Sequence, residues 1–493
     1  MKRFLLLTLC LIAMMLRAQQ WKIEYPMEES VLLKGGSCNG SGNYIIGVCD
    51  MGSEGYTSSY AMYVDNEGNY VEKRFSHDGY KSNFCGSICL DDGNAFVVGV
   101  KGGTKDDCVF DTLSIMIMTP ELEIVEEHDY PVVEPYKTWL TDAYLRFNNY
   151  GEIVVLTDAS VYENPVSITV GVYVVLKCDT FGNVLKSQYF AEGHSLSGAR
   201  PTGIIRVPNS DNMMMLGRGF NANGYHTITY IDNDLNLVAS YPLPWLESFW
   251  NHTECWKDNE HFLMSSLTHH YGVMENSKYV GVFEVDATGH YNDTLVYDRC
   301  DTSDYSAQFG SMAYVNDDAI YIATYWERGL DEVPTDAVIC MIDKDLNLLG
   351  TKRLADDNTK IRLYHCQTTA DGGCLVYGQC KRVDGDYMVM VWKLLPKDFV
   401  IQWTVNDMPE ALRNECIYPN PVSNCLNIRM KDDFCTDFSI IITDARGRKH
   451  FERRFENCNG LLTLDISTLA DGVYVCEIVY DDGHAFKEKI IKN

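Results

Sequence analysis

The sequence predicts an all-β protein: a seven-bladed β-propeller followed by a small C-terminal β-sandwich. Two polar turn motifs recur in step along residues 30–405, and apolar segments of strand length separate them. Residues 416–493 also alternate apolar and polar positions between turns, but without that repeat. Alternation with a period of two, bounded by turn residues, is typical of strands that are buried on one face.

Length and charge narrow the function classes. The chain has 493 residues, of which 46% are hydrophobic, and 41 Lys and Arg stand against 69 Asp and Glu for a net charge of −28. A single core stops growing at about 250–300 residues, so this length requires several domains or a repeat architecture. The negative charge argues against binding nucleic acid or an anionic membrane surface, because both depend on clustered cations.

The first residues are typical of a secretory signal peptide. Lys2 and Arg3 precede an almost entirely apolar run at 4–16, and Ala18 stands before a polar residue, so we expect residues 1–18 to be removed. The apolar run is shorter than the roughly 20 residues that span a bilayer, which disfavours a membrane anchor. No later stretch is long and apolar enough, so we expect no transmembrane segment in the mature chain and a route through the periplasm.

The region 19–405 is predicted to be the repeat domain. One turn motif, rich in Asp, Asn and Gly, recurs about every 55 residues, a period typical of repeat architectures. Its copies lie at 65–69, 120–122, 179–183, 232–236, 286–289, 343–347 and 397–399. A second turn motif lies between these copies, at 40–43, 91–94, 149–152, 209–212, 257–260, 316–318 and 370–373.

Two hairpin turns in each repeat give four antiparallel strands. Four-stranded sheets repeated around an axis form a β-propeller, which leaves only short exposed edges. Six or eight blades, or a pair of stacked β-sandwiches, remain as alternatives. The repeats resemble those of secreted bacterial propellers in general and carry the signature of no catalytic family.

After a linker at 406–415, the tail at 416–493 carries four ordered motifs, at 418–421, 444–447, 469–474 and 489–492. With these motifs the tail resembles the C-terminal sorting domain of the type IX secretion system of Bacteroidetes. The resemblance implies that the secretion machinery is a partner, and that the protein is released or held on the outer cell surface. An ordinary accessory β-domain is the alternative. The residues that match the sorting signal are Pro419, Asn420, Pro421, Asp444, Gly447, Asp471, Gly472, Tyr474, Lys489 and Lys492.

The sequence indicates no cofactor, no metal site and no catalytic residue. Its 18 cysteines include no Cys-x-x-Cys pair, so we expect mostly buried thiols, with several periplasmic disulfides as the alternative. Acidic pairs such as Asp106-Asp107 and Asp317-Asp318 lack the spacing of a calcium loop and are expected to be solvated turns.

The candidate ligand site is aromatic. Trp245, Trp250 and Trp256 lie within 12 residues, and an exposed indole face stacks well on sugar rings. Packing between blades is the alternative for these tryptophans. Three arginines, Arg200, Arg206 and Arg218, could grip a carboxylate, although scattered surface arginines are the simpler interpretation.

Two readings of function follow. In the first, a secreted or cell-surface propeller without catalytic activity binds an extracellular glycan or protein. In the second, the protein is a secreted hydrolase or lyase that acts on polysaccharide or peptide at the propeller channel. The absence of catalytic motifs favours the first reading. An active site assembled from single residues on different blades would leave no motif, however, so convergent ionisable groups in the channel would favour the second.

Overall fold

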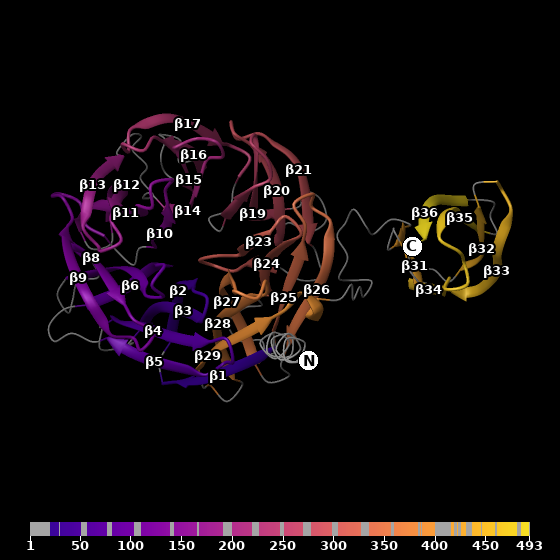
Figure 1. Ribbon diagram of the computed structural model, residues 1–493, viewed down its shortest axis with the longest axis horizontal. Helices are drawn as coiled ribbons and strands as arrows, with labels where there is room; N and C mark the ends of the chain where they lie inside the picture. Colours follow the sequence, from indigo (N-terminus) through magenta and orange to yellow (C-terminus); the bar gives the residue numbers. More distant parts are fainter. Residues whose placement is uncertain are drawn as a thin grey trace, which may run out of the picture. The chain divides into compact units, whose positions relative to one another are not determined.

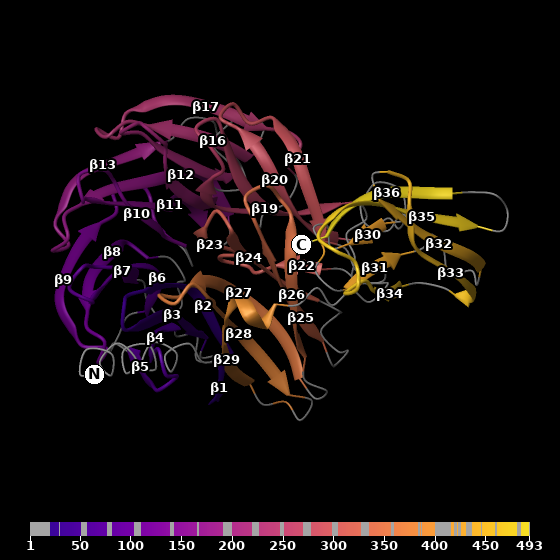
Figure 2. The ribbon, with the colours of Figure 1, turned by 45° about the vertical axis from the view of Figure 1, so that its right-hand side comes forward.

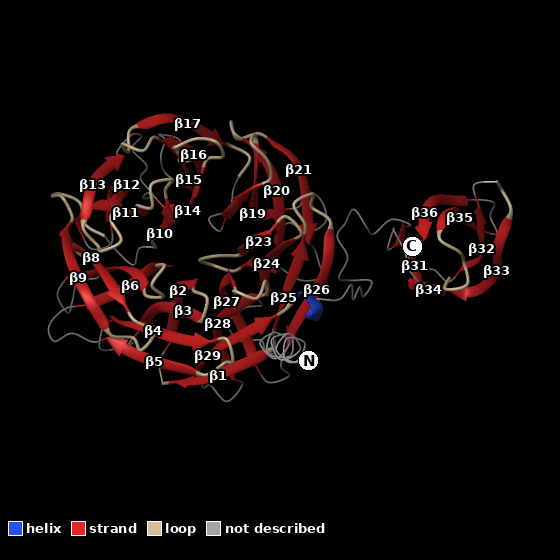
Figure 3. Cartoon of the chain, viewed as in Figure 1, coloured by secondary structure: helices blue, strands red, loops and turns tan. Residues whose placement is uncertain are grey.

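The protein is built from β-strands. The computed structural model describes residues 20–492 apart from 29, 51–56, 76–80, 103–109, 139–141, 165–166, 191–199, 219–225, 247–250, 270–277, 298–303, 327–334, 356–358, 383–384, 386, 400–415, 419–421, 423–424, 430–435, 445, 459–460 and 481–484. The predicted signal peptide and linker therefore lie outside the described residues. In the part that is described, the helical content is one short 3₁₀ turn, η2 (Pro396–Asp398), drawn in blue in Figure 3. The chain divides into two compact units, and the main boundary falls after Gln402.

Unit 1 contains seven antiparallel sheets among its described residues, numbered here in chain order. Six of them have four strands, and sheet 6 has a fifth, short strand. Sheets 1 to 3 are β2 (Ser30–Cys38), β3 (Gly42–Asp50), β4 (Thr57–Asp65), β5 (Tyr70–Phe75); β6 (Lys81–Cys89), β7 (Ala95–Gly102), β8 (Thr112–Met118), β9 (Ile124–Pro131); and β10 (Tyr144–Phe147), β11 (Ile153–Asn164), β12 (Ser167–Cys178), β13 (Val184–Phe190).

Sheets 4 to 6 also take their strands in sequence, with β23 paired to β24 beside the main path of sheet 6, and sheet 7 takes its fourth strand from the start of the chain. They are β14 (Arg200–Arg206), β15 (Met213–Arg218), β16 (His226–Ile231), β17 (Leu237–Leu243); β18 (Asn251–Trp256), β19 (His261–His269), β20 (Lys278–Asp286), β21 (Tyr291–Tyr297); β22 (Asp304–Ser306), β23 (Met312–Asn316), β24 (Ala319–Trp326), β25 (Asp336–Ile342), β26 (Leu348–Ala355); and β27 (Thr359–Thr368), β28 (Cys374–Arg382), β29 (Tyr387–Leu394), β1 (Trp21–Met27).

Sheet 7 joins the two ends of the repeat region. The first strand of the chain, β1, pairs antiparallel with β29, from Trp21 opposite Lys393 to Met27 opposite Tyr387. The N-terminal strand therefore completes the sheet that the last repeat begins. Figure 1 shows the sheets of unit 1 arranged in a ring, with β2, β6, β10, β14, β23 and β27 toward the centre and β5, β9, β13 and β17 at the rim.

The recurring Asp turns connect the third and fourth strands of the sheets. Asp65, Asp179, Asp232 and Asp343 use the same contacts: each carboxylate accepts backbone N–H groups two and four residues later, and the side chain of Asn at the fourth position, at 2.8–3.0 Å. An Asp that bonds its own backbone stabilises a tight turn. The repeat in the sequence is thus a repeat of one local structure.

One position in these turns adopts left-handed backbone geometry. Positive φ values occur at Gly68, Leu122, Gly182, Leu235, Gly289 and Leu346. The three leucines carry a steric cost there that glycine does not. Their side chains are buried, which offsets that cost. The seventh copy differs, because Phe399 has a φ of −89° after the 3₁₀ turn.

The hydrophobic core of unit 1 lies between neighbouring sheets. One cluster joins Tyr44 and Ile46 of sheet 1 to Phe84 and Val97 of sheet 2. Equivalent clusters join sheets 2 and 3, 3 and 4, 4 and 5, 6 and 7, and 7 and 1. Figures 1 and 2 show from two directions that neighbouring sheets pack against each other around the ring.

Unit 2 has two antiparallel sheets in its described part. One consists of β30 (Cys416–Tyr418), β31 (Cys425–Arg429) and β34 (Leu461–Asp465), and the other of β33 (Lys449–Cys458), β32 (Thr436–Asp444), β35 (Gly472–Tyr480) and β36 (Ala485–Lys492). A single hydrophobic cluster draws on both sheets, with Leu426 and Ile428 from the first and Ile440 and Ile478 from the second. The two sheets therefore share one core.

Candidate functional site

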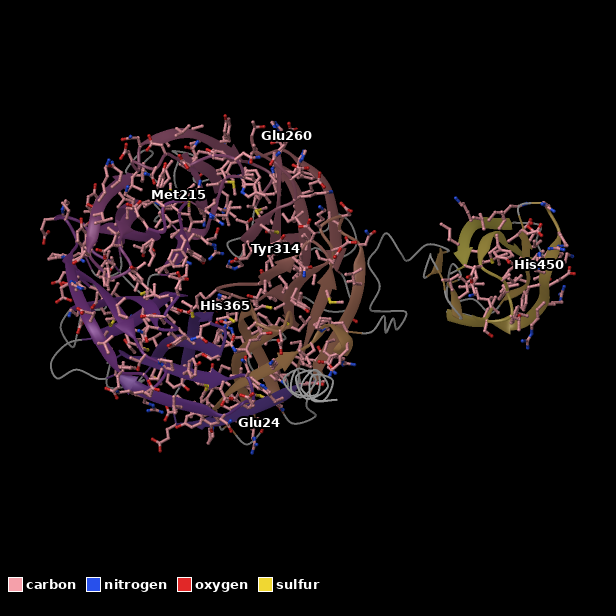
Figure 4. The ribbon with its side chains drawn as sticks, in the orientation of Figure 1. Glu24, Met215, Glu260, Tyr314, His365 and His450 are labelled. Carbon is pink, nitrogen blue, oxygen red and sulfur yellow. The ribbon has the colours of Figure 1, made fainter. Side chains whose placement is uncertain are left out.

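Inner strands of sheets 1, 2, 3, 5, 6 and 7 surround an inner cavity of about 290 Å³ at the centre of unit 1. Its lining comes from β2, β6, β10, β18, β23 and β27 and from the segment before β23. The strands approach so closely that glycine is required at some positions. A Cβ on Gly86 would lie 2.0 Å from the carbonyl oxygen of Ala143, and one on Gly310 would lie 2.4 Å from Nε2 of His365. Tyr314 and His365 lie toward the middle of the ring in Figure 4.

A second, outer cavity of about 750 Å³ is formed by sheets 3 to 6. Arg146, Glu254 and Tyr314 line both cavities, so the two spaces meet at these side chains. The rest of its lining mixes polar, charged and apolar groups: Asn149, Ile205, Arg206, Val207, Pro208, Asn209, Ser210, Asp211, Cys255 and Trp256.

β-bulges shape the wall of the inner cavity. The pairing register shifts by one residue in the first strands of sheets 1, 2, 4, 5 and 7. The residues left out of register are Lys34, Cys85, Thr202, Glu254 and Tyr364. A bulge re-aims the side chain it carries and is common beside functional sites. Here Lys34 and Glu254 both line the inner cavity.

Two ion pairs lie in the wall. The buried ammonium of Lys34 lies 3.1 Å from Oδ1 of Asp142 and 5.7 Å from the centre of the Phe309 ring. The guanidinium of Arg146 pairs with the carboxylate of Glu254 and donates a hydrogen bond to the carbonyl oxygen of Leu145 at 2.9 Å. The carboxylate of Glu254, which lines both cavities, is therefore matched by one cation.

Two histidines face the inner cavity. His252 is 3% exposed, and its Nε2 has no hydrogen-bond partner among the described residues. His365 stacks flat on Tyr377 with the ring centres 5.4 Å apart, and its Nδ1 also lacks a partner in the described part of the chain. Burial lowers the pKa of His252 to about 4 and that of His365 to about 3. Both imidazoles are therefore neutral at neutral pH.

Tyr144 lies beside these histidines. Its ring centre is 6.5 Å from that of His252, and it lines the inner cavity. Burial, followed by the nearby Asp142, raises the pKa of Tyr144 well above its usual value. The phenol therefore keeps its proton. Both shifts move these groups away from neutral pH, so burial makes the two imidazoles weak bases and the phenol a weak acid.

The structure separates the predicted tryptophans. Trp256 lines the outer cavity, and its buried Nε1 has no partner among the described residues. Trp245 packs against Phe283 and Tyr291, with ring centres 5.2 and 4.9 Å apart, and donates a hydrogen bond to the carbonyl oxygen of Gly289. Both tryptophans are half-buried on the same hydrophobic cluster. Trp250 lies outside the described residues.

The predicted arginines also separate. Arg206 lines the outer cavity and donates to Oδ1 of Asn149 at 3.5 Å. Arg200 and Arg218 face each other across β14 and β15 and line neither cavity.

Of the acidic turns, Asp317 accepts hydrogen bonds from the hydroxyl of Tyr314 and the ammonium of Lys344, each at 2.8 Å. Across the described residues, no group of three or more His, Cys, Asp or Glu side chains is placed to hold a metal. The cysteines whose side chains are described form no disulfides among themselves; Cys38 and Cys89 are half-buried and the others are buried.

In unit 2 the sorting-signal residues occupy a turn and the edge of a sheet. The carboxylate of Asp444 accepts backbone N–H groups of Arg446 and Arg448, and Gly447 takes a φ of 76°. Tyr474 donates to the carbonyl oxygen of Ala470 at 2.8 Å. In the register of β35 and β36, Gly472 lies opposite Lys492 and Val475 opposite Lys489. Nζ of Lys492 lies 3.7 Å from Oδ1 of Asp471. Pro419, Asn420 and Pro421 lie outside the described residues.

Comparison with known proteins identifies this unit. Residues 416–493 match the family model of the secretion system C-terminal sorting domain. The tail is a type IX sorting domain. The sorting domain implies handling by the type IX secretion machinery and export to the cell surface or beyond. The helices of the described residues include none long and apolar enough to cross a membrane.

For the whole chain, no curated protein sequence matches. Solved structures that are similar include a polysaccharide lyase, an ulvan lyase, at 12% identity and a TM-score of 0.45, with 76% of this chain and 95% of that chain covered. An apocarotenoid oxygenase from Synechocystis matches at 10% identity and a TM-score of 0.40, covering 78% and 95%. The sialidase NanB from Streptococcus pneumoniae matches at 8% and 0.39, covering 76% and 70%. These enzymes catalyse different reactions and assign none to this chain.

Proposed function

We propose that unit 1 is a seven-bladed β-propeller and unit 2 a small β-sandwich. Seven sheets in sequential order, closure of the last sheet by β1, and hydrophobic clusters between adjacent sheets support the propeller. Two sheets on one shared core support the sandwich. A signal peptide at 1–18 would bring the chain to the periplasm, where the sorting domain is recognised.

We propose that the exported propeller binds a polysaccharide in the outer cavity. The observation that carries this proposal is the composition of that cavity: an aromatic side chain, Trp256, stands with Arg146, Arg206 and Asn209 around about 750 Å³. Ligand pockets of this size bury small molecules or short chain segments, whereas protein partners use broad and flatter surfaces. Indole faces stack on sugar rings, and guanidinium and amide groups bond their oxygens.

The indole N–H of Trp256 is not open to the cavity. Its Nε1 is buried and has no acceptor among the described residues, so the ring of Trp256, and not its N–H, is the part that would contact a sugar. Trp245 differs, because its N–H bonds the carbonyl oxygen of Gly289 and its side chain does not line the cavity.

Affinity electrophoresis of the full chain through gels that contain single polysaccharides tests the proposal. We expect at least one polysaccharide to retard the protein, and Trp256→Ala to abolish the retardation. Trp245→Ala is the matched control, because both side chains are half-buried on one cluster but only Trp256 lines the cavity. Equal effects of the two substitutions, or passage through every gel without retardation, would contradict the proposal.

A further inference from the structure

The formal charges around the outer cavity cancel. Among its lining residues Arg146 and Arg206 are cations, Asp211 and Glu254 are anions, and the other side chains carry no formal charge. The chain as a whole has a net charge of −28, so this balanced wall differs from the rest of the protein. A charged ligand would meet groups of both signs there. The partners of each charged group therefore decide what the wall can bind.

Arg146 and Glu254 form one pair in this wall. Glu254 is the residue that the bulge in β18 leaves out of register, and its carboxylate pairs with the guanidinium of Arg146 from β10. The side chains are 33% and 34% exposed, so a ligand can reach both members of the pair. An anionic group on the ligand would have to displace Glu254 from the guanidinium, which would leave two anions facing each other.

Asn149 links the other two charged groups. Its amide nitrogen donates to Oδ1 of Asp211 at 2.9 Å, and its amide oxygen accepts from Arg206 at 3.5 Å. Hydrogen bonds from Asn149 and from the hydroxyl of Tyr150 lower the pKa of Asp211, so this carboxylate is ionised at neutral pH. Arg206 and Asp211 are exposed, and neither forms an ion pair with another described residue. A cation and an anion therefore stand on either side of one amide, both open to a ligand.

Sugar hydroxyls suit such pairs better than anions do. A hydroxyl both donates and accepts, so neighbouring hydroxyls of one sugar can accept from a guanidinium and donate to a carboxylate at the same time. Hydrogen bonds to charged groups are also stronger than those between neutral groups. A sugar carboxylate or sulfate is only an acceptor, and it would meet Asp211 and Glu254 as like charges.

We propose that the outer cavity binds an uncharged polysaccharide and discriminates against one that carries carboxylates or sulfates. Hydroxyls of the chain bond both members of the pair Arg146 and Glu254 and both Arg206 and Asp211, while the ring of Trp256 supports the apolar face of a sugar. The inference rests on the proposed function, because a polysaccharide must occupy the cavity before its charge has an effect there.

The net charge of the chain favours the same ligands. A charge of −28 repels a polyanion before contact and leaves an uncharged polymer unaffected. Salt screens such long-range forces beyond about 8 Å at physiological ionic strength. We therefore expect the binding of an uncharged polymer to change little as salt is added.

Affinity electrophoresis of the full chain tests the inference with matched polymers. The gels contain neutral glucans, xylans or mannans, or a polyuronate, or the same polyuronate after reduction of its carboxylates to alcohols. We expect at least one uncharged polymer to retard the protein, and any reduced polymer that does so to retard it more than its charged parent. Glu254→Gln should weaken the binding of the uncharged polymer by about tenfold or more and strengthen that of the charged parent. Asp211→Asn, at an exposed turn position, should shift the preference in the same direction.

Glu284→Gln is the matched control, because Glu284 lies on β20 of the same sheet as Glu254, pairs with Lys257 and lines neither cavity. It should leave the preference unchanged. Retardation by charged polymers alone, abolished by Trp256→Ala, would overturn the preference for an uncharged chain and leave the proposed binding function intact. Passage through every gel without retardation would overturn both proposals. Equal effects of Glu254→Gln and Glu284→Gln on the preference would overturn the role of the ion pair.

Discussion

Leu235→Gly sets two opposing energies against each other at one turn. Leu235 has a φ of 59°, where glycine would relieve a steric cost of about 1–2 kcal/mol. Its side chain is 1% exposed and packs with Ile231, Met213 and Val154 across two sheets. Removing a buried leucine side chain costs about 3–5 kcal/mol, including the cavity it leaves. Packing outweighs strain, so we expect a net destabilisation of about 2–4 kcal/mol, taking the extra backbone freedom of glycine into account.

Guanidinium denaturation followed by tryptophan fluorescence measures this effect. Residues 416–493 contain no tryptophan, so the signal reports the repeat region. Asn209→Gly is the control, because Asn209 has a φ of 53° but an exposed side chain, whose amide donates a hydrogen bond to the exposed Asn259. We expect its stability to change by no more than about 0.5 kcal/mol. A Leu235→Gly protein as stable as the parent, or more stable, would refute the reasoning that burial holds this turn.

Three further predictions follow from buried charges and from the tail. Lys393 is fully buried, and its ammonium lies 2.6 Å from the carboxylate of the exposed Asp371. Lys393→Met leaves that carboxylate hydrated, so it should lower the free energy of unfolding by about 1–3 kcal/mol. Lys22→Met, at an exposed position, should change it by less than about 1 kcal/mol in the same denaturation assay. On folding, the pKa of His252 falls from about 6.5 to about 4, so its neutral form contributes fully to the free energy of unfolding above pH 6.5 and that contribution is lost as the pH falls toward 4. The denaturation midpoint of His252→Gln should therefore fall less steeply over this pH range than that of the parent protein. Parallel slopes would contradict this prediction. Deleting residues 416–493 should keep the protein off the cell surface and out of the medium in its native host, as cell fractionation would show, and unchanged delivery would contradict the role of the tail.

The turn chemistry explains how much of the fold the sequence could predict. Asp followed by Asn four residues later predicts a tight turn from local contacts alone, and the structure places those contacts in one turn after another. Leucine at a left-handed position could not be foreseen in the same way, because its cost is offset by packing on a neighbouring sheet. That packing depends on residues far away in the sequence.

The inner cavity was beyond sequence reasoning for a physical reason. Bulges at Lys34 and Glu254 break the alternation that tells which face of a strand a residue occupies. Tyr144, His252 and His365 come from three sheets, and only the closed ring brings them together. Gly-Gly at 35–36 and Gly-Ser at 86–87 were the available signal, since glycine within a strand marks close approach of backbones.

The central claim is that the outer cavity formed by sheets 3 to 6 is where this protein meets its ligand. The most direct measurement is a crystal structure of the full chain soaked with a short oligosaccharide from a polysaccharide that retards the protein. The account predicts sugar rings in the outer cavity, beside Trp256 and Arg206. An oligosaccharide bound on the outer strands β5, β9 or β13, with both cavities holding only water, would contradict it.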